Sequence, residues 1–279
     1  MQKSRPLLIL PDGRHIPPIF LGTWDIRTPE QASMAIKAAM TSGYGGIDTA
    51  ACYENENLIR QGINDSGVPR SKVFITSKLW NNAHGFNPAL KAFEESEKKL
   101  GSIDIFLIHW PGPVHSFLET WKALERLYDE KRVQVIGVSN FMMSQLDILL
   151  HECRIKPMIN QIECHLWYND FMLLDYCRKH DIAVQAYSPL SAGTGLLRDK
   201  TLIEIAEKLG KTPAQLALRY LWQIGVYPIP KSSNPKRIAE NNDFFDFEIP
   251  VNYMQKLLSM NRLVRTNKDP LQWFDPEYR

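Results

Sequence analysis

Strand and helix patterns alternate along almost the whole chain, and this alternation constrains the fold more than any other feature. Short apolar runs typical of strands begin near residues 19, 46, 73, 104, 133, 157, 182 and 226. Helical patterns or helix-start signals lie between them, as at Thr28-Pro29, from about Glu54, and at Asn87-Pro88. Eight consecutive β/α units favour a closed parallel barrel over an open sheet. We therefore predict an α/β fold of the (β/α)8 TIM-barrel class.

The two ends of the chain extend this barrel. Residues 7–18 predict a small hairpin around the turn Pro11-Asp12-Gly13. Residues 251–279 predict a tail that reaches over one rim of the barrel. No Gly/Ser tract, low-complexity stretch or block of like charge marks a linker. We expect residues 1–279 to form a single barrel domain.

The composition argues against several classes of function. With 33 basic and 31 acidic residues the net charge is +2, which gives no case for nucleic-acid or membrane binding. The sequence contains neither an apolar segment long enough to span a bilayer nor the apolar stretch of a signal peptide. The four cysteines, Cys52, Cys153, Cys164 and Cys177, lack C-x-x-C spacing and indicate reduced core thiols in a cytoplasmic protein.

Three of the predicted strands end in ionisable residues. Asp48 ends the segment 46–48, Lys78 ends the segment 73–78, and His109 ends the segment 105–109. Tyr53 follows in the turn after the first of them. Because the carboxyl ends of parallel barrel strands converge on one rim, we expect these four side chains to lie close together.

The four side chains suit the protonation of an oxygen atom on which negative charge develops. A tyrosine hydroxyl has an ordinary pKa of about 10, and an ammonium group such as that of Lys78 favours the phenolate. Asp48 would fix the position of the lysine, and His109 would hydrogen-bond a carbonyl oxygen or assist proton transfer. Each residue alone has an ordinary structural explanation, such as a helix cap, a packed ring or a solvated charge. The prediction therefore depends on all four.

A second set of polar residues ends the predicted strands five, six and seven, and consists of Ser139, Asn140, Gln161 and Tyr187. Hydroxyl and amide groups can orient a carboxamide, and a tyrosine ring can stack on a heteroaromatic ring. Turn chemistry and core packing are the structural alternatives. After strand eight, the basic and hydroxyl residues of the segment 231–237 suit a phosphate group, or else a solvated helix entry. Neither G-x-G-x-x-G nor a P-loop occurs, so a Rossmann or P-loop site is not indicated.

Several motifs resemble those of the aldo-keto reductase family, in the family's order, over nearly the whole chain. They are Leu21-Gly22-Thr23-Trp24, Gly46-Ile47-Asp48-Thr49-Ala50 with Tyr53, Ile75-Thr76-Ser77-Lys78-Leu79-Trp80, Ile108-His109-Trp110-Pro111, Ile136-Gly137-Val138-Ser139-Asn140-Phe141, Asn160-Gln161-Ile162-Glu163 and Ile229-Pro230-Lys231-Ser232. The chain departs from the family at Glu54 and Arg60, where glycine is usual, and at Leu166, where proline is usual.

The resemblance implies reduction of aldehydes and ketones to alcohols, with NADPH (NADP+) as cofactor, bound without a Rossmann fold. Tyr53 would be the general acid, Lys78 paired with Asp48 would lower its pKa, and His109 would orient the carbonyl group. The implied cofactor-binding residues are Thr23, Ser139, Asn140, Gln161, Tyr187, Ser188, Leu190, Lys231, Ser232, Arg237, Glu240 and Asn241. The substrate pocket would include Trp24, Trp80, Trp110 and Trp273. The family resemblance further implies a monomer that acts on small carbonyl compounds, such as dicarbonyls, diketo-sugar acids and aromatic aldehydes, without a metal.

Two other functions stay open from the sequence alone. The first is a nucleotide-binding barrel without catalytic activity, used as a redox sensor or a structural subunit. The complete quartet argues against it, because such a protein has no chemical need for all four residues. The second is a metal-dependent hydrolase, which needs several His, Asp or Glu residues at strand ends. Lys78 among them is a poor neighbour for a metal ion.

Overall fold

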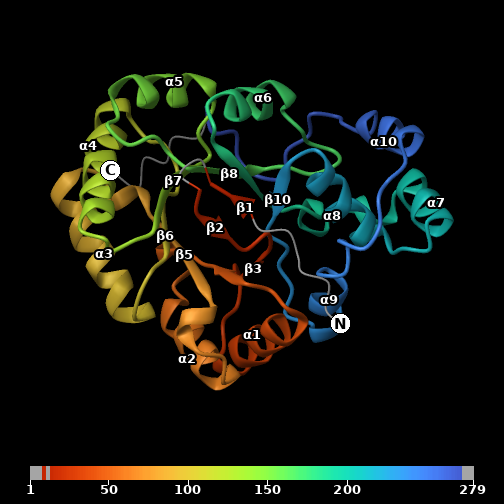
Figure 1. Ribbon diagram of the computed structural model, residues 1–279, viewed down its shortest axis with the longest axis horizontal. Helices are drawn as coiled ribbons and strands as arrows, with labels where there is room; N and C mark the ends of the chain where they lie inside the picture. The colour runs from red at the N-terminus through yellow and green to blue at the C-terminus, as the bar shows by residue number, and fades with distance from the viewer. Residues whose placement is uncertain (1–7, 11–12, 272–279) are drawn as a thin grey trace.

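The centre of the molecule is a barrel of eight parallel strands, which the computed structural model shows within residues 8–10 and 13–271, the part of the chain that it describes (Figure 1). The strands are β3 (Phe20–Gly22), β4 (Gly46–Asp48), β5 (Phe74–Leu79), β6 (Ile105–Ile108), β7 (Val135–Ser139), β8 (Ile159–Glu163), β9 (Ala183–Tyr187) and β10 (Val226–Pro228). Each strand pairs with the next in chain order. The Gly22 amide donates to Pro230 O over 3.0 Å, which joins the first strand to the end of the last. The predicted (β/α)8 TIM barrel is confirmed.

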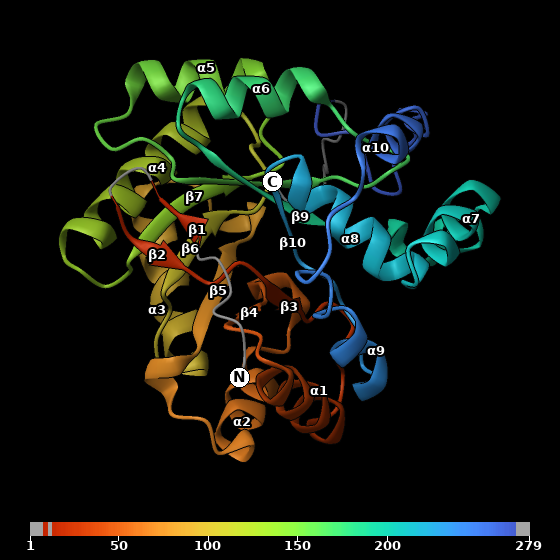
Figure 2. The same ribbon diagram turned by 45° about the vertical axis from the view of Figure 1, so that its right-hand side comes forward.

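Helices surround the strands on the outside, as Figures 1 and 2 show. They are α1 (Pro29–Ser42), α2 (Glu56–Ser66), α3 (Phe86–Leu100), α4 (Val114–Asp129), α5 (Met143–Glu152), α6 (Phe171–Lys179), α7 (Lys200–Lys208), α8 (Pro213–Gln223), α9 (Pro235–Glu240) and α10 (Val251–Leu258). The predicted cap at Thr28 is confirmed, because its side chain accepts a hydrogen bond from the Gln31 amide and Pro29 is the first helical residue. Asn234 caps α9 in the same way.

Two predicted helix starts are wrong by about two residues. Helix α3 begins at Phe86, so Pro88 is its third residue rather than its first. A proline is tolerated there because first-turn amides have no partner within the helix. Helix α2 begins at Glu56 rather than near Glu54, because the short 3-10 helix η1 (Ala51–Tyr53) comes first. Glu54, the cap residue directly after η1, has φ +56°, a left-handed conformation that suits the glycine usual at this position.

The predicted N-terminal hairpin covers the amino-terminal end of the barrel. Strands β1 (Leu8–Ile9) and β2 (His15–Ile16) pair antiparallel. Leu10 and Ile16 pack in one buried cluster with Phe20 and Ile105, which begin β3 and β6. The hairpin is thus confirmed, although Pro11 and Asp12 of its turn lie outside the described residues.

The tail returns to the opposite rim. After α10 the chain reaches the end of β8, where the Thr266 and Asn267 amides donate to the Glu163 carboxylate. Among the described residues, no helix has the length and apolar character needed to cross a membrane. All four cysteines are unpaired. Cys164 and Cys177 are buried as expected, whereas Cys52 and Cys153 are half-buried, and Cys153 packs against the core.

Candidate active site

The carboxyl ends of β4, β5 and β6 bring the predicted quartet to one rim. Lys78 is fully buried, and its Nζ donates to Asp48 Oδ1 over 2.6 Å and to Thr49 O over 2.8 Å. The same Nζ lies 5.1 Å from the centre of the Tyr53 ring. The Tyr53 and His109 rings meet edge to face, with centroids 5.9 Å apart. The four side chains therefore form one cluster, as their positions at the strand ends predict.

The protonation states of the cluster follow from burial. Burial, followed by the charge of Asp48, raises the pKa of Tyr53 well above its ordinary value of 10.0. A net lowering of this pKa by Lys78 is therefore not found in this structure, because burial and the charge of Asp48 outweigh any such effect. Burial, together with the charge of Lys78, lowers the pKa of His109 well below 6.5. At neutral pH the site therefore holds a protonated phenol beside a neutral imidazole.

The residues expected to hold a carboxamide lie next to this cluster. The Ser139 hydroxyl donates to Gln161 O over 2.8 Å, and the Tyr187 hydroxyl donates to Asn140 Oδ1 over 2.7 Å. Asn140 Nδ2 also donates to the carbonyl oxygen of His109 over 3.0 Å. Asn140 has φ +63°, a left-handed conformation that asparagine tolerates, and it turns the chain directly after β7. The structure thus brings these four predicted residues together, and Asn140 connects them to the quartet.

The other predicted cofactor residues lie on three segments. Thr23 is buried after β3, and its hydroxyl donates to Asp48 O over 2.9 Å. Ser188 and Leu190 lie half-buried in the loop after β9, where Ser188 has φ +48°. The remaining five residues lie between the end of β10 and Asn241, the residue directly after α9. Lys231 and Arg237 are exposed, Ser232 and Asn241 are buried, and Glu240 accepts a hydrogen bond from the Thr212 hydroxyl.

The predicted tryptophans occupy different positions. Trp80 packs edge to face on His109, with ring centroids 5.1 Å apart, so it belongs to the site. Trp110 follows His109 directly and is half-buried. Trp24 is 61% exposed in the turn after β3. Trp273 lies outside the described residues.

Sequence reasoning missed Asn55, which holds the loops of the site together. Its Nδ2 donates to Thr23 O over 2.9 Å, and its Oδ1 accepts from the Thr49 hydroxyl over 2.7 Å. Asn55 is only 1% exposed. It therefore ties the loop after β3 to the loop after β4, which carries Tyr53. The sequence feature that could have identified Asn55 is its place as a polar residue two positions after Tyr53, directly before a helix.

Glu163 was also missed as a functional residue, although it lies in a quoted motif. Its buried carboxylate accepts from the amide and hydroxyl of Thr266, the amide of Asn267 and Nε2 of His165. Burial acts to raise the pKa of Glu163, but the hydrogen bonds from His165 and Thr266 outweigh it and hold the pKa below 4.5. Glu163 thus anchors the tail at the rim that carries the quartet.

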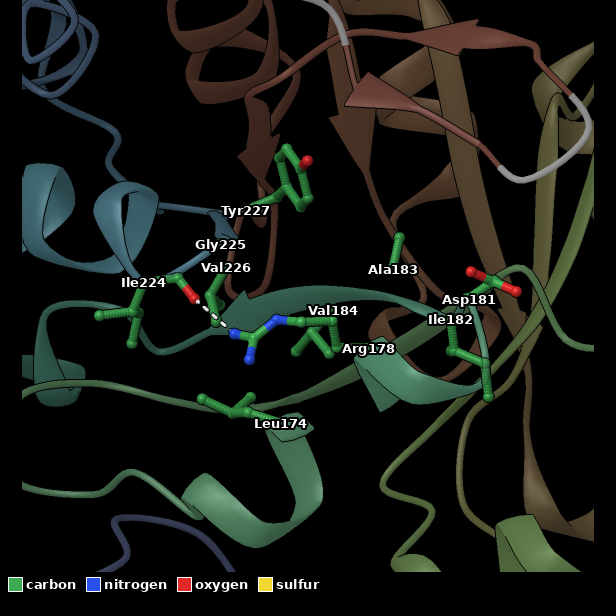
Figure 3. Close-up of a pocket in the computed structure, with 10 residues that line it drawn as sticks. All are labelled: Leu174, Arg178, Asp181, Ile182, Ala183, Val184, Ile224, Gly225, Val226 and Tyr227. Carbon is green, nitrogen blue, oxygen red and sulfur yellow. Dashed lines mark hydrogen bonds between the residues drawn. The ribbon is translucent and has the colours of Figure 1, made fainter. Parts of the chain in front are cut away.

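A pocket of about 240 Å³ lies away from this rim (Figure 3). Its lining includes Ala183 and Val226, the first residues of β9 and β10, so it opens at the amino-terminal ends of the strands. Arg178 reaches across it to Ile224 O over 3.4 Å. The pocket contains none of the quartet. Among the described residues, moreover, no three His, Cys, Asp or Glu side chains lie close enough to hold a metal ion, so the metal-dependent alternative gains no support.

Comparison with known proteins agrees with this arrangement. The model of the "Aldo/keto reductase family" matches residues 18–262. The 9,11-endoperoxide prostaglandin H2 reductase of Trypanosoma cruzi is 43% identical over 263 residues, with 93% of each chain covered. The glyoxal reductase of Bacillus subtilis is 43% identical over 263 residues, which cover 94% of this chain and 95% of that protein.

A solved structure with the same fold carries a nucleotide. The aldo-keto reductase of Bombyx mori in complex with NADP superposes with a TM-score of 0.87 at 35% identity, over 94% of this chain and 95% of that chain. The family match, the two reductases and this fold agree with one another. The chain therefore belongs to the aldo/keto reductase family and is an oxidoreductase that reduces carbonyl compounds.

Proposed function

We propose that this protein reduces aldehydes and ketones to alcohols with NADPH, and that Tyr53 is the general acid. The surroundings of the Tyr53 side chain support this most directly. Its ring meets the ring of neutral His109 edge to face and lies against the ammonium of Lys78, and its hydroxyl is protonated at neutral pH. Within the described chain it makes no hydrogen bond, so its proton is available to a substrate oxygen.

The side chains of the rim fit a nicotinamide nucleotide. Bound NADPH would supply the hydride for the carbonyl carbon. Asn140 and Gln161 offer amide groups for the carboxamide, and no described residue donates to Gln161 Oε1, which can therefore accept a hydrogen bond. Tyr187 offers a ring face for stacking. The exposed cations Lys231 and Arg237 suit the 2′-phosphate that distinguishes NADPH from NADH.

Proton transfer would use the quartet as follows. His109, being neutral, donates one ring N–H to the carbonyl oxygen and orients it. Tyr53 then gives its proton to that oxygen as charge develops on it. The Lys78 ammonium, fixed by Asp48, stabilises the phenolate that remains, even though it does not make the free phenol acidic. Lys78 and Asp48 would thus act in the transition state rather than before substrate binds.

Small carbonyl compounds are the proposed substrates. Trp80 packs on His109 and Trp110 follows His109 in the chain, and such aromatic residues suit flat or compact molecules. The glyoxal reductase among the relatives supports dicarbonyls first. We further propose that residues 1–279 act as one domain and as a cytoplasmic monomer. The four unpaired cysteines support the location, and the family resemblance supports the oligomeric state.

The test is the loss of NADPH absorbance with methylglyoxal, an aromatic aldehyde, a diketo-sugar acid and a quinone, each repeated with NADH. Turnover that prefers NADPH is the expected result and ranks the substrates. Saturable NADPH binding without turnover on any compound would overturn the proposal in favour of a nucleotide-binding protein without catalytic activity.

A further inference from the structure

Cys52 contacts the imidazole of His109 at its Nδ1 atom. The residue lies in η1, directly before Tyr53, and its Sγ is 3.5 Å from Nδ1 of His109. Within the described chain this is the one hydrogen-bond contact that either ring nitrogen makes. The two residues are 57 positions apart in the sequence. A thiol therefore occupies the place where carbonyl or carboxylate groups often orient a histidine.

The chain fixes both partners of this contact. Hydrogen bonds from the Tyr53 amide to Ala50 O, over 3.0 Å, and from the Glu54 amide to Ala51 O, over 3.1 Å, hold the turn that carries Cys52. The His109 ring makes edge-to-face contacts with the rings of Tyr53 and Trp80. These ring contacts do not exclude a half-turn of the imidazole, which exchanges Nδ1 with Cδ2 and Nε2 with Cε1 with little change in shape. The thiol distinguishes the two orientations.

The thiol can act as the donor in this contact. Burial raises the pKa of Cys52 to about 12, although Lys78 acts against it, so sulfur keeps its proton. A neutral imidazole has one N–H donor and one nitrogen acceptor. The contact could use either the imidazole nitrogen or the sulfur atom as acceptor. Sulfur is a weak acceptor, so the favoured arrangement is an S–H group that donates to Nδ1. The proton of the ring then resides on Nε2.

We propose that Cys52 is a positioning residue that holds His109 in the tautomer with its proton on Nε2. The N–H group then points toward the substrate carbonyl oxygen, which it must reach to orient and polarise it. Cys52 touches neither substrate nor cofactor in this role and acts through His109. The role rests on the proposed reductase function, in which His109 is a hydrogen-bond donor.

Nitrogen NMR of the free protein, labelled with ¹⁵N-histidine, tests the tautomer directly. The His109 signals are assigned by their loss in His109→Gln. The expected result is a protonated Nε2 in the wild type and in Cys52→Ser, which keeps a hydroxyl donor. In Cys52→Ala we expect a mixture of tautomers. A proton on Nδ1 in the wild type would overturn the proposal, and this measurement needs no variant at position 52 to fold.

Kinetics supply the second readout. Cys52→Ala should lower kcat for a carbonyl substrate about two- to tenfold, with the KM for NADPH unchanged. Cys52→Ser should recover most of that loss, which mere removal of side-chain volume would not predict. Equal kcat and equal tautomer in Cys52→Ala and wild type would overturn the proposal. The two experiments can fail independently. An inactive wild type would contradict the reductase function, whereas the NMR spectrum tests the tautomer without any turnover.

Discussion

Gln161 and Asp48 share a hydrogen bond that joins the two halves of the site: Gln161 Nε2 donates to Asp48 Oδ2 over 2.8 Å. The other carboxylate oxygen of Asp48 accepts from Lys78. A single buried carboxylate thus connects the proposed carboxamide site to the ammonium beneath Tyr53. Displacement of either partner changes the surroundings of the other, so we expect the proposed cofactor contacts and the proposed acid to be coupled.

Lys78→Met removes the cation from this group and leaves the Asp48 carboxylate buried and unpaired. The free energy of unfolding should fall by about 3–5 kcal/mol, because the buried charge loses its partner. Denaturant unfolding at neutral pH measures this. Lys122→Met is the control, since that exposed lysine forms its ion pair with exposed Glu119 on α4 and its loss should cause no measurable change. Equal stability of the two variants would contradict the account.

The pH dependence of reduction should be flat through the neutral range. The reaction needs Tyr53 protonated and His109 neutral. Because the pKa of Tyr53 lies well above 10.0 and that of His109 well below 6.5, neither form is lost between these values. The measurement is kcat/KM for the carbonyl substrate, which reports groups of the species that binds it. An acid limb centred near 6.5 would show that His109 titrates normally.

Arg237→Ala should weaken NADPH binding and leave NADH almost unaffected. Loss of a charged hydrogen bond to the 2′-phosphate predicts a rise of about 10- to 100-fold in the Kd for NADPH. Lys236→Ala is the matched control, because it removes a neighbouring exposed cation of the same short helix. Equal effects on NADPH and NADH, or equal effects of both variants, would mean that Arg237 does not contact the 2′-phosphate.

Glu163→Gln should loosen the tail. Since the folded-state pKa of Glu163 is below 4.5, its carboxylate stabilises the fold above that pH, and this contribution is lost as the pH falls through the folded value. The variant should therefore be less stable at neutral pH and lose less stability on acidification. Hydrogen exchange at the Thr266 and Asn267 amides should accelerate. Glu207→Gln, at an exposed position on α7, should change neither quantity.

The sequence predicted the barrel and the quartet for a common physical reason. Strand periodicity locates the strand ends, and the parallel barrel forces Asp48, Lys78 and His109 to share a rim. The burial of a side chain cannot be read from the sequence. The prediction of a lowered pKa for Tyr53 therefore left out desolvation, which raises this pKa. The sequence pattern did not predict short local turns either: the 3-10 helix η1 precedes α2, which therefore begins later than expected.

Contacts between distant segments were the least predictable. Glu163 meets Thr266 across 103 positions, and that contact depends on the path of a loop. Cys52 meets His109 only because a 3-10 turn points its thiol inward. Neither contact produces a periodicity or a motif of its own. Each needs the three-dimensional path of the backbone.

The most direct test of the account is Tyr53→Phe, measured as kcat for a reactive aldehyde together with the Kd for NADPH. The account predicts a fall in kcat of about 100- to 10,000-fold, because the general acid is lost. The Kd for NADPH should not change, since the hydroxyl makes no hydrogen bond to any described residue. Full turnover in Tyr53→Phe would contradict the assignment of Tyr53 as the acid, and with it the mechanism proposed for this site.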